Sequence, residues 1–169
     1  EAARNIHEKS FKTIADFLPS KDQIIGADFS FMKYSSRYDQ VLDGGEPNIF
    51  SPHFSGGALV DLGVYPIYAA LAWFGMPKES VYFGQKIATG VDGFGVGVLR
   101  YDNFDVTIRT GKINDSFQQS EIYLVNGTLV MDAVNSISEA IFHDRNHQRR
   151  EKLAVHQLEN PMVEEADEF

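Results

Sequence analysis

Residues 55–67 read Ser-Gly-Gly-Ala-Leu-Val-Asp-Leu-Gly-Val-Tyr-Pro-Ile and open an unusually apolar helix. The pattern predicts that this helix runs from about Gly57 to Phe74, with Ser55 as its N-cap and Gly75 after its last turn. A helix that is apolar on almost every side is typically buried. We therefore expect it to be the element on which a sheet packs.

Two polar side chains interrupt this helix. Asp61 and Tyr65 are four residues apart, so they lie one above the other on one face. Asp61 lies near the positive end of the helix dipole, which favours its ionised form, and a phenol can give or take a proton when a nearby cation stabilises its anion. Gly56 and Gly57 leave the helix start bare, so a ligand or another backbone can approach. We interpret the pair as one wall of a polar site; the alternative is that Asp61 complements the dipole and Tyr65 bonds to a loop.

The segments on either side of this helix predict one α+β domain. An amphipathic helix covers residues 6–17, a strand covers 24–34, and a long loop covers 35–55. Downstream the chain is nearly all strand, with expected strands at residues 81–88, 93–101, 104–110, 121–125, 128–133, 137–143 and 153–158. Hairpin turns are expected at Asp102-Asn103, at Asn126-Gly127 (where both residues tolerate positive φ) and within 145–150. Sequential hairpins imply a mostly antiparallel open sheet with helices packed on one face.

Several expected strands are apolar at consecutive positions, as at residues 122–125. Such strands need cover on both faces. Because the helices can cover one face, we expect the other to meet a second subunit in a homodimer or higher homo-oligomer.

The composition and charge of the chain exclude several classes of function. The chain has 169 residues, no cysteine, and 24 acidic against 15 basic residues, for a formal charge of −9. This balance argues against a nucleic-acid partner, and the missing cysteines exclude disulfides and thiolate chemistry. No apolar run approaches the ~20 residues of a membrane span, and no signal peptide is evident, so we expect no membrane partner and a cytoplasmic setting.

Both ends of the sequence look interrupted. The first residues already follow a helical pattern. Asn160-Pro161 begins another helix shortly before the last residue of the sequence. We therefore expect residues 1–169 to be a single domain of a longer polypeptide.

Other candidates come from the long loop and from isolated motifs. A loop of this length can line a substrate pocket, although an ordinary surface loop is an equal alternative. Its candidate substrate-binding residues are Arg37, Tyr38, Asn48 and His53. His143 and His147 have a metal-like spacing but no third ligand, so we expect no metal site.

The segment 56–67 closely resembles the signature of the glucose–fructose oxidoreductase / inositol dehydrogenase / rhizopine-catabolism (Gfo/Idh/MocA) family, in its dihydrodiol-dehydrogenase-like branch. Residues 35–39 and 48–50 support the resemblance. It implies that this chain is the C-terminal domain, with the fold of the dihydrodipicolinate-reductase-like second domain. That domain shapes the substrate site and usually the dimer, after an N-terminal Rossmann domain that this chain lacks.

The resemblance also implies roles. Tyr65 would be the acid or base on the substrate, Asp61 would position substrate or catalytic groups, and a Lys-Pro motif in the Rossmann domain would supply a catalytic lysine. NAD or NADP would be bound mainly by that domain, and the substrate would be a small molecule with a sugar, polyol or dihydrodiol CH–OH group.

The chain departs from the family pattern in one respect. It has no Gly-x-Gly-x-x-Gly between a strand and a helix, and the glycines of 93–97 continue as a strand, where they relieve crowding. We therefore expect the chain alone to be inactive. The alternatives are a non-catalytic dinucleotide-binding regulator of the same fold and a freestanding interaction module.

Overall fold

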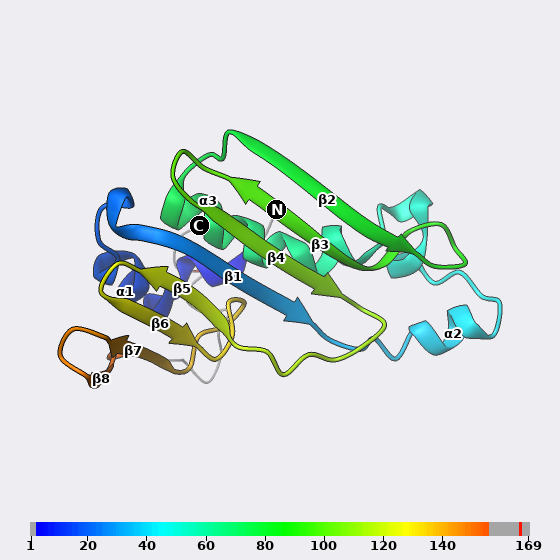
Figure 1. The fold of residues 1–169 in the computed structure, drawn as a ribbon. Helices are drawn as coiled ribbons and strands as arrows, with labels where there is room; N and C mark the ends of the chain where they lie inside the picture. Colours follow the sequence, from blue (N-terminus) through cyan, green and yellow to red (C-terminus); the bar gives the residue numbers. More distant parts are fainter. Residues whose placement is uncertain (1–2, 156–165, 167–169) are drawn as a thin grey trace.

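A computed structural model describes residues 3–155 and Ala166. Its centre is one eight-stranded sheet in the order β2-β3-β4-β1-β5-β6-β7-β8 (Figure 1). The strands are β1 (Ile24–Met32), β2 (Glu79–Lys86), β3 (Asp92–Arg100), β4 (Asp105–Gly111), β5 (Ser120–Leu124), β6 (Gly127–Met131), β7 (Ala140–Asp144) and β8 (Arg149–Lys152). Only the pairing of β1 with β4 is parallel among these strands, so the expected α+β fold with a mostly antiparallel open sheet is confirmed.

Helices α1 (Lys9–Phe17) and α3 (Val64–Phe74) pack on one face of this sheet, whereas the short α2 (Tyr38–Leu42) lies beyond the ends of the strands (Figure 1). The chain also forms short 3₁₀ turns, η1 (Arg4–His7), η2 (Lys21–Gln23), η3 (Asn48–Phe50) and η4 (Pro52–Phe54), and a π-helical turn, η5 (Leu59–Gly63). Aromatic rings join the layers: Trp73 of α3 stacks on Phe11 of α1 at 4.4 Å and meets Phe29 of β1 edge-on at 5.6 Å. The apolar helix is thus the core element that its composition predicts.

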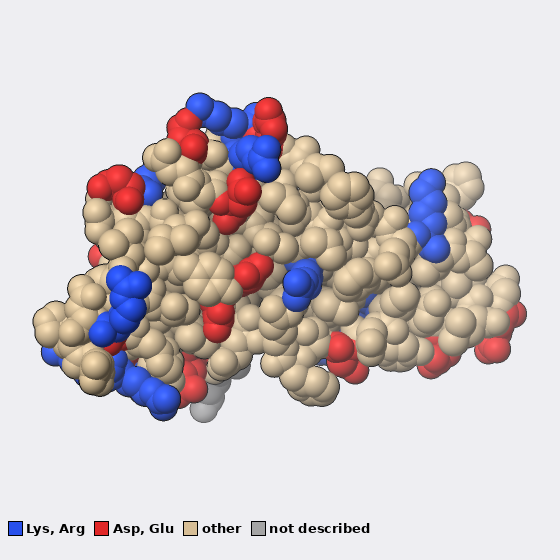
Figure 2. Space-filling view, in the orientation of Figure 1, with Lys and Arg blue, Asp and Glu red and all other residues tan. Residues whose placement is uncertain are grey.

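Among the residues that the structure describes, no helix lies on the opposite face of the sheet (Figure 1). Val81 and Phe83 of β2 are exposed there, opposite half-buried Val98 and Val96 of β3. Figure 2 shows this face as mostly uncharged, with scattered acidic and basic groups. We call it the open sheet face.

The glycines of β3 leave room for the side chains of neighbouring residues. A Cβ at Gly95 would overlap the Tyr82 ring, and one at Gly93 would lie 2.5 Å from a methyl of Ile87. Strand β3 continues through Arg100 without a helix start. The interpretation that these glycines relieve crowding is therefore confirmed.

The β5–β6 hairpin forms where it was predicted, but by another mechanism. The two turn residues are Val125 and Asn126, Leu124 pairs with Gly127, and Asn126 and Gly127 both lack a positive φ. Gly127 is required instead because a Cβ there would overlap the carbonyl oxygen of His143 on β7. The positive-φ explanation was wrong.

Three predicted boundaries also change. The first helix is broken by extended Glu8 into η1 and α1, and the loop 35–55 contains α2, η3 and η4. A tight turn with Gln148 at φ 50° starts β8 at Arg149, so the predicted strand 153–158 is wrong for residues 153–155. Its remainder and the helix start at Asn160-Pro161 lie outside the described residues.

One sequence-based exclusion was too strong. The segment Pro52–Phe74 is long and apolar enough to cross a membrane by length and composition alone. In the structure Ala69, Ala70 and Phe74 of this segment are buried in the core against the sheet. The same test is passed by core helices of soluble proteins, so the segment is weak evidence for a membrane span.

Candidate functional site

The helix that carries Asp61 and Tyr65 starts on a π-helical turn that the sheet caps. Ser55 adopts a left-handed conformation (φ 53°) at the end of η4, so its prediction as the N-cap was wrong. The cap is Asp92 at the start of β3, whose Oδ2 accepts the backbone N–H of Leu59 at 2.8 Å. Gly57, at φ +124°, is needed here because a Cβ would overlap the Asp92 carboxylate.

Strand β4 is also bonded to this π-helical turn. The hydroxyl of Thr110 donates a hydrogen bond to the carbonyl of Ala58 at 2.9 Å. The irregular turn η5 ends at Gly63, three residues before Pro66. The distortion precedes the proline because Pro66 has no N–H to offer the preceding turn. Such π-helical turns frequently occur at functional sites.

Asp61 forms an ion pair with a buried lysine at the end of β4. The ammonium of Lys112 donates to Oδ2 of Asp61 and also lies 5.0 Å from the centre of the Phe50 ring. The Lys112 side chain is 2% exposed, whereas the Asp61 side chain is 50% exposed. The carboxylate therefore connects a buried cation with the surface.

Two neighbouring hollows meet at Asp61. One has a volume of about 290 Å³ and the other about 270 Å³, and both are lined by Asp61 and Ile49. Asn48, Phe54, Ser55, Gly56 and Val60 complete the first, and Lys33, Tyr34, Ser35, Ser36, Leu62 and Lys112 complete the second. Asp61 is thus placed to contact a small polar ligand in either hollow.

Tyr65 lies one turn further along the helix and is half-buried. Its ring meets Phe31 of β1 edge-on at 5.4 Å. Phe31 lines a third hollow of about 300 Å³, which shares Lys33 with the second. Within the described residues the Tyr65 hydroxyl has no hydrogen-bond partner, and Tyr65 itself lines none of these three hollows.

The four loop candidates separate in the structure. Asn48 lines the first hollow with Asp61. Tyr38 instead packs against Phe50, at 5.6 Å between ring centres. Arg37 and His53 are exposed and line neither hollow beside Asp61.

Lys112 is the site residue that sequence reasoning missed. A signal was present, because side chains alternate along a strand. Val106, Ile108 and Thr110 face the helices, and the same period places Lys112 on that face, two residues beyond Thr110. A lysine predicted to point at an apolar helix needs a partner, and Asp61 is the acid on that helix.

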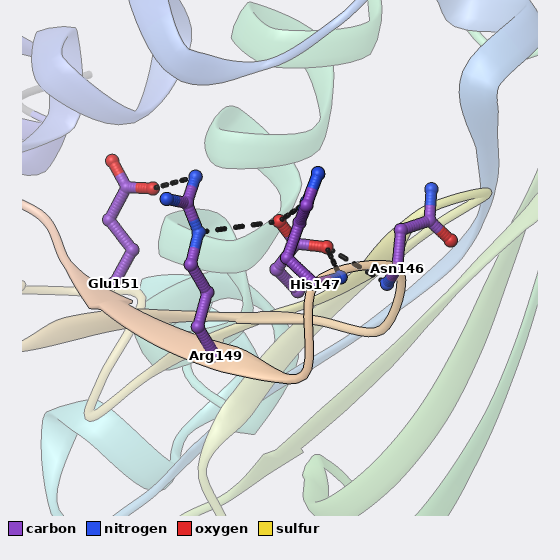
Figure 3. A network of polar contacts seen from close by, with 5 residues as sticks. Asn146, His147, Arg149 and Glu151 are labelled. Atoms are coloured by element: carbon purple, nitrogen blue, oxygen red, sulfur yellow. Dashed lines mark hydrogen bonds and ion pairs between the residues drawn. The ribbon is translucent and has the colours of Figure 1, made fainter.

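A second polar network lies in the β7–β8 turn, away from these hollows (Figure 3). Oδ1 of Asp144 accepts the backbone N–H groups of Asn146 and His147 at 2.9 and 3.0 Å. Its Oδ2 lies 2.7 Å from Nδ1 of His147 and 3.6 Å from Nε of Arg149. Between residues 3 and 155 and at Ala166, the structure contains no group of three His, Cys, Asp or Glu that could hold a metal. We therefore interpret this network as one carboxylate, that of Asp144, stabilising the β7–β8 turn.

Comparison with known proteins gives consistent matches. Residues 29–130 match the family model of the GFO/IDH/MocA C-terminal domain. The whole chain is 36% identical to the uncharacterized oxidoreductase YgjR of Escherichia coli and 34% identical to scyllo-inositol 2-dehydrogenase (NADP(+)) IolU of Bacillus subtilis, and covers 51% of each. The chain thus spans about half the length of these curated relatives.

Solved structures share the fold at low sequence identity. KijD10, a 3-ketoreductase from Actinomadura kijaniata solved with TDP-benzene and NADP, matches with a TM-score of 0.72 and 19% identity over 98% of this chain and 49% of that one. An inositol dehydrogenase homolog from Azotobacter vinelandii complexed with NAD+ matches with a TM-score of 0.71 and 11% identity over 91% of this chain and 44% of that one.

Proposed function

The chain belongs to the GFO/IDH/MocA family through its C-terminal domain, and from this premise we propose that it is the substrate-binding domain of an NAD(P)-dependent oxidoreductase. The substrate we propose carries a CH–OH group of a sugar, polyol or dihydrodiol. Support comes from IolU, a scyllo-inositol dehydrogenase that aligns with every residue of this chain.

One observation carries the proposal: Asp61, half-exposed, lies where two hollows meet, and Tyr65 follows one turn later on the same helix. A carboxylate there accepts hydrogen bonds from substrate hydroxyls. The Tyr65 hydroxyl, without a partner in the described part of the chain, can hold or move the proton of the reacting hydroxyl.

The described residues do not fit a dinucleotide by themselves. Its pyrophosphate needs a glycine-rich turn between a strand and a helix N-terminus. The glycines of 93–97 lie inside β3, and Gly56-Gly57 follows η4 rather than a strand. We therefore assign cofactor binding to residues outside those described, and we give this chain's glycines no role in the reaction.

The open sheet face supports a further part of the proposal, a homodimer. Val81 and Phe83 of β2, with Val96 and Val98 of β3, make its β2–β3 end apolar, and no helix of the described residues covers them. Contiguous exposed apolar surface on a sheet commonly marks an interface. A second copy seated there would leave the hollows at Asp61, on the helix side, accessible.

The test uses the full-length protein that contains this chain. We expect reduction of NAD+ or NADP+ with polyols such as scyllo-inositol, and a loss of kcat of about 10²- to 10⁴-fold in Tyr65→Phe, because proton transfer by a positioned side chain contributes that much. Tyr68→Phe, which removes the same hydroxyl from the next tyrosine of α3, is the matched control. Near wild-type turnover of Tyr65→Phe would reject Tyr65 as the proton carrier, and a protein that binds dinucleotide but turns over no polyol or sugar would favour the regulator.

A further inference from the structure

We infer that Lys112 is the positioning residue of the site: it holds the Asp61 carboxylate in place and fixes which of its oxygens faces the substrate. The inference rests on the proposed function. It adds a residue of this domain to the site, in addition to any lysine supplied from elsewhere in the protein.

The burial of Lys112 is the first argument. Its side chain is 2% exposed, and the contacts of its ammonium in the described residues are the Asp61 carboxylate and the face of Phe50. An ammonium removed from water is stable only when paired, because desolvation of an isolated charge costs far more than one ring contact returns. The burial of Lys112 therefore depends on its ion pair with Asp61.

The backbone fixes the direction of the lysine. The N–H of Lys112 donates to the carbonyl of Gly93 at 2.8 Å, which continues the β3–β4 ladder by one step beyond Gly111. Two residues earlier, Thr110 holds the start of the π-helical turn. The same strand thus positions both the helix start and the charge that meets Asp61.

The two oxygens of Asp61 are not equivalent. Oδ2 accepts from Lys112, and Oδ1 makes no hydrogen bond within the part of the chain that the structure describes. Because half of the side chain is exposed between two hollows, Oδ1 is the acceptor left for a substrate hydroxyl. Asp61 accordingly acts as a fixed acceptor and does not donate a proton.

Other charged and titratable groups face the same space. Lys33 and Tyr34, at the end of β1, line the second hollow, and Tyr65 follows on the helix. The first hollow adds polar but uncharged side chains, Asn48 and Ser55. Among these neighbours of Asp61, Lys112 is the one that forms an ion pair with it.

The test compares Lys112→Met, Lys112→Arg, Asp61→Asn and the double variant Lys112→Met/Asp61→Asn in the full-length protein. Methionine is one atom shorter than lysine, but it is unbranched and suits a buried site, so the protein should still fold. We expect Lys112→Met to lower kcat/KM on the order of 10-fold, as loss of an orienting partner does. Lys112→Arg should recover part of the loss, and the double variant should be no worse than Asp61→Asn alone. Lys86→Met, an exposed lysine at the end of β2, is the control.

A second readout does not need turnover. In protein labelled with ¹³C at aspartate carboxyls, with Asp61→Asn assigning the signal, the chemical shift of the Asp61 carboxyl at one fixed pH should differ between Lys112→Met and wild type. An unchanged chemical shift, an unchanged kcat/KM, or losses that add in the double variant would each overturn the inference. A wild-type protein without oxidoreductase activity would overturn the proposed function, while the carboxyl chemical shift would still decide the role of Lys112.

Discussion

Asp92 at the start of β3 caps a helix that begins 33 residues earlier in the chain, because its Oδ2 accepts the N–H of Leu59 at 2.8 Å. The same oxygen accepts the hydroxyl of Tyr82 on β2 at 2.5 Å. Burial, and then this hydrogen bond, raise the pKa of Tyr82 far above its usual value, so the phenol remains a donor. One carboxylate therefore ties the edge of the sheet to the start of the helix that carries Asp61.

This relationship predicts that Asp92→Ala destabilises the protein. The substitution removes a helix cap, which contributes about 1 kcal/mol, and leaves the partly buried Tyr82 hydroxyl without its acceptor, at a further cost of about 1–3 kcal/mol. We expect the free energy of unfolding in urea to fall by about 2–4 kcal/mol. Ser55→Ala should change it by less than about 0.5 kcal/mol. A larger loss for Ser55→Ala than for Asp92→Ala would contradict this account of the helix start.

A second prediction concerns the glycine beneath Tyr82. A Cβ at Gly95 would overlap the Tyr82 ring, so Gly95→Ala should cost about 1–3 kcal/mol of unfolding free energy through overpacking. Because the obstacle is a side chain, Tyr82→Ala should remove most of that cost, and the double variant should be more stable than the sum of the single losses implies. Additive losses in urea denaturation would show that the ring is not the obstacle.

A third prediction concerns Gly127, where the expected outcome differs from that at Gly95. At Gly127 the obstacle to a Cβ is the backbone carbonyl of His143 on the neighbouring strand. No side-chain truncation can make room there, so Gly127→Ala should open the β6–β7 ladder. Faster amide hydrogen exchange confined to β6 and β7 would report this opening, and wild-type exchange in both strands would refute it.

These elements show what the sequence could predict. Residues 106, 108 and 110 share one face of β4, as the alternation of side chains along a strand predicts. Asp102-Asn103 joins β3 to β4 as expected, with the N–H of Tyr101 bonded to the carbonyl of Phe104 at 2.9 Å. The parallel pairing of β1 with β4 was not predictable, because it joins strands that are distant in the chain.

The site was predicted in part for the same reason. Asp61 and Tyr65 share a local helical spacing, and Asn48 lies in the adjacent loop, so local patterns were enough to select them. Asp92 and Lys112 reach the helix only through sheet pairing, which no local pattern encodes. Arg37 and His53 were selected, like Asn48, for their place in the long loop, but neither lines the hollows at Asp61.

The proposed homodimer gives a fourth prediction. Phe83 is 68% exposed on the open sheet face, so Phe83→Glu would bury a charge in an interface formed there. We expect at least about a 10-fold weaker dimer by analytical ultracentrifugation. Met76→Glu, at an exposed residue between α3 and β2, should leave association unchanged. A wild-type protein that is monomeric at micromolar concentration, or a Phe83→Glu variant that still dimerises fully, would exclude this face.

The last prediction concerns the β7–β8 turn. The hydrogen bond from His147, together with the backbone N–H groups of His147 and Asn146, holds the pKa of Asp144 below its usual value. A carboxylate whose pKa is lower in the folded than in the unfolded state stabilises the fold above the unfolded value, about 3.9, and loses this effect as the pH falls through the folded value. Asp144→Asn keeps an oxygen for the turn but removes the charge. Its melting temperature should therefore lie below that of wild type at pH 7 and pH 5, and the two should converge as the pH falls through the lowered folded-state pKa of Asp144. Asp43→Asn, at an exposed residue, controls for the loss of a negative charge. A gap for Asp144→Asn that persists unchanged at the lowest pH would show that the charge of Asp144 contributes nothing to the turn.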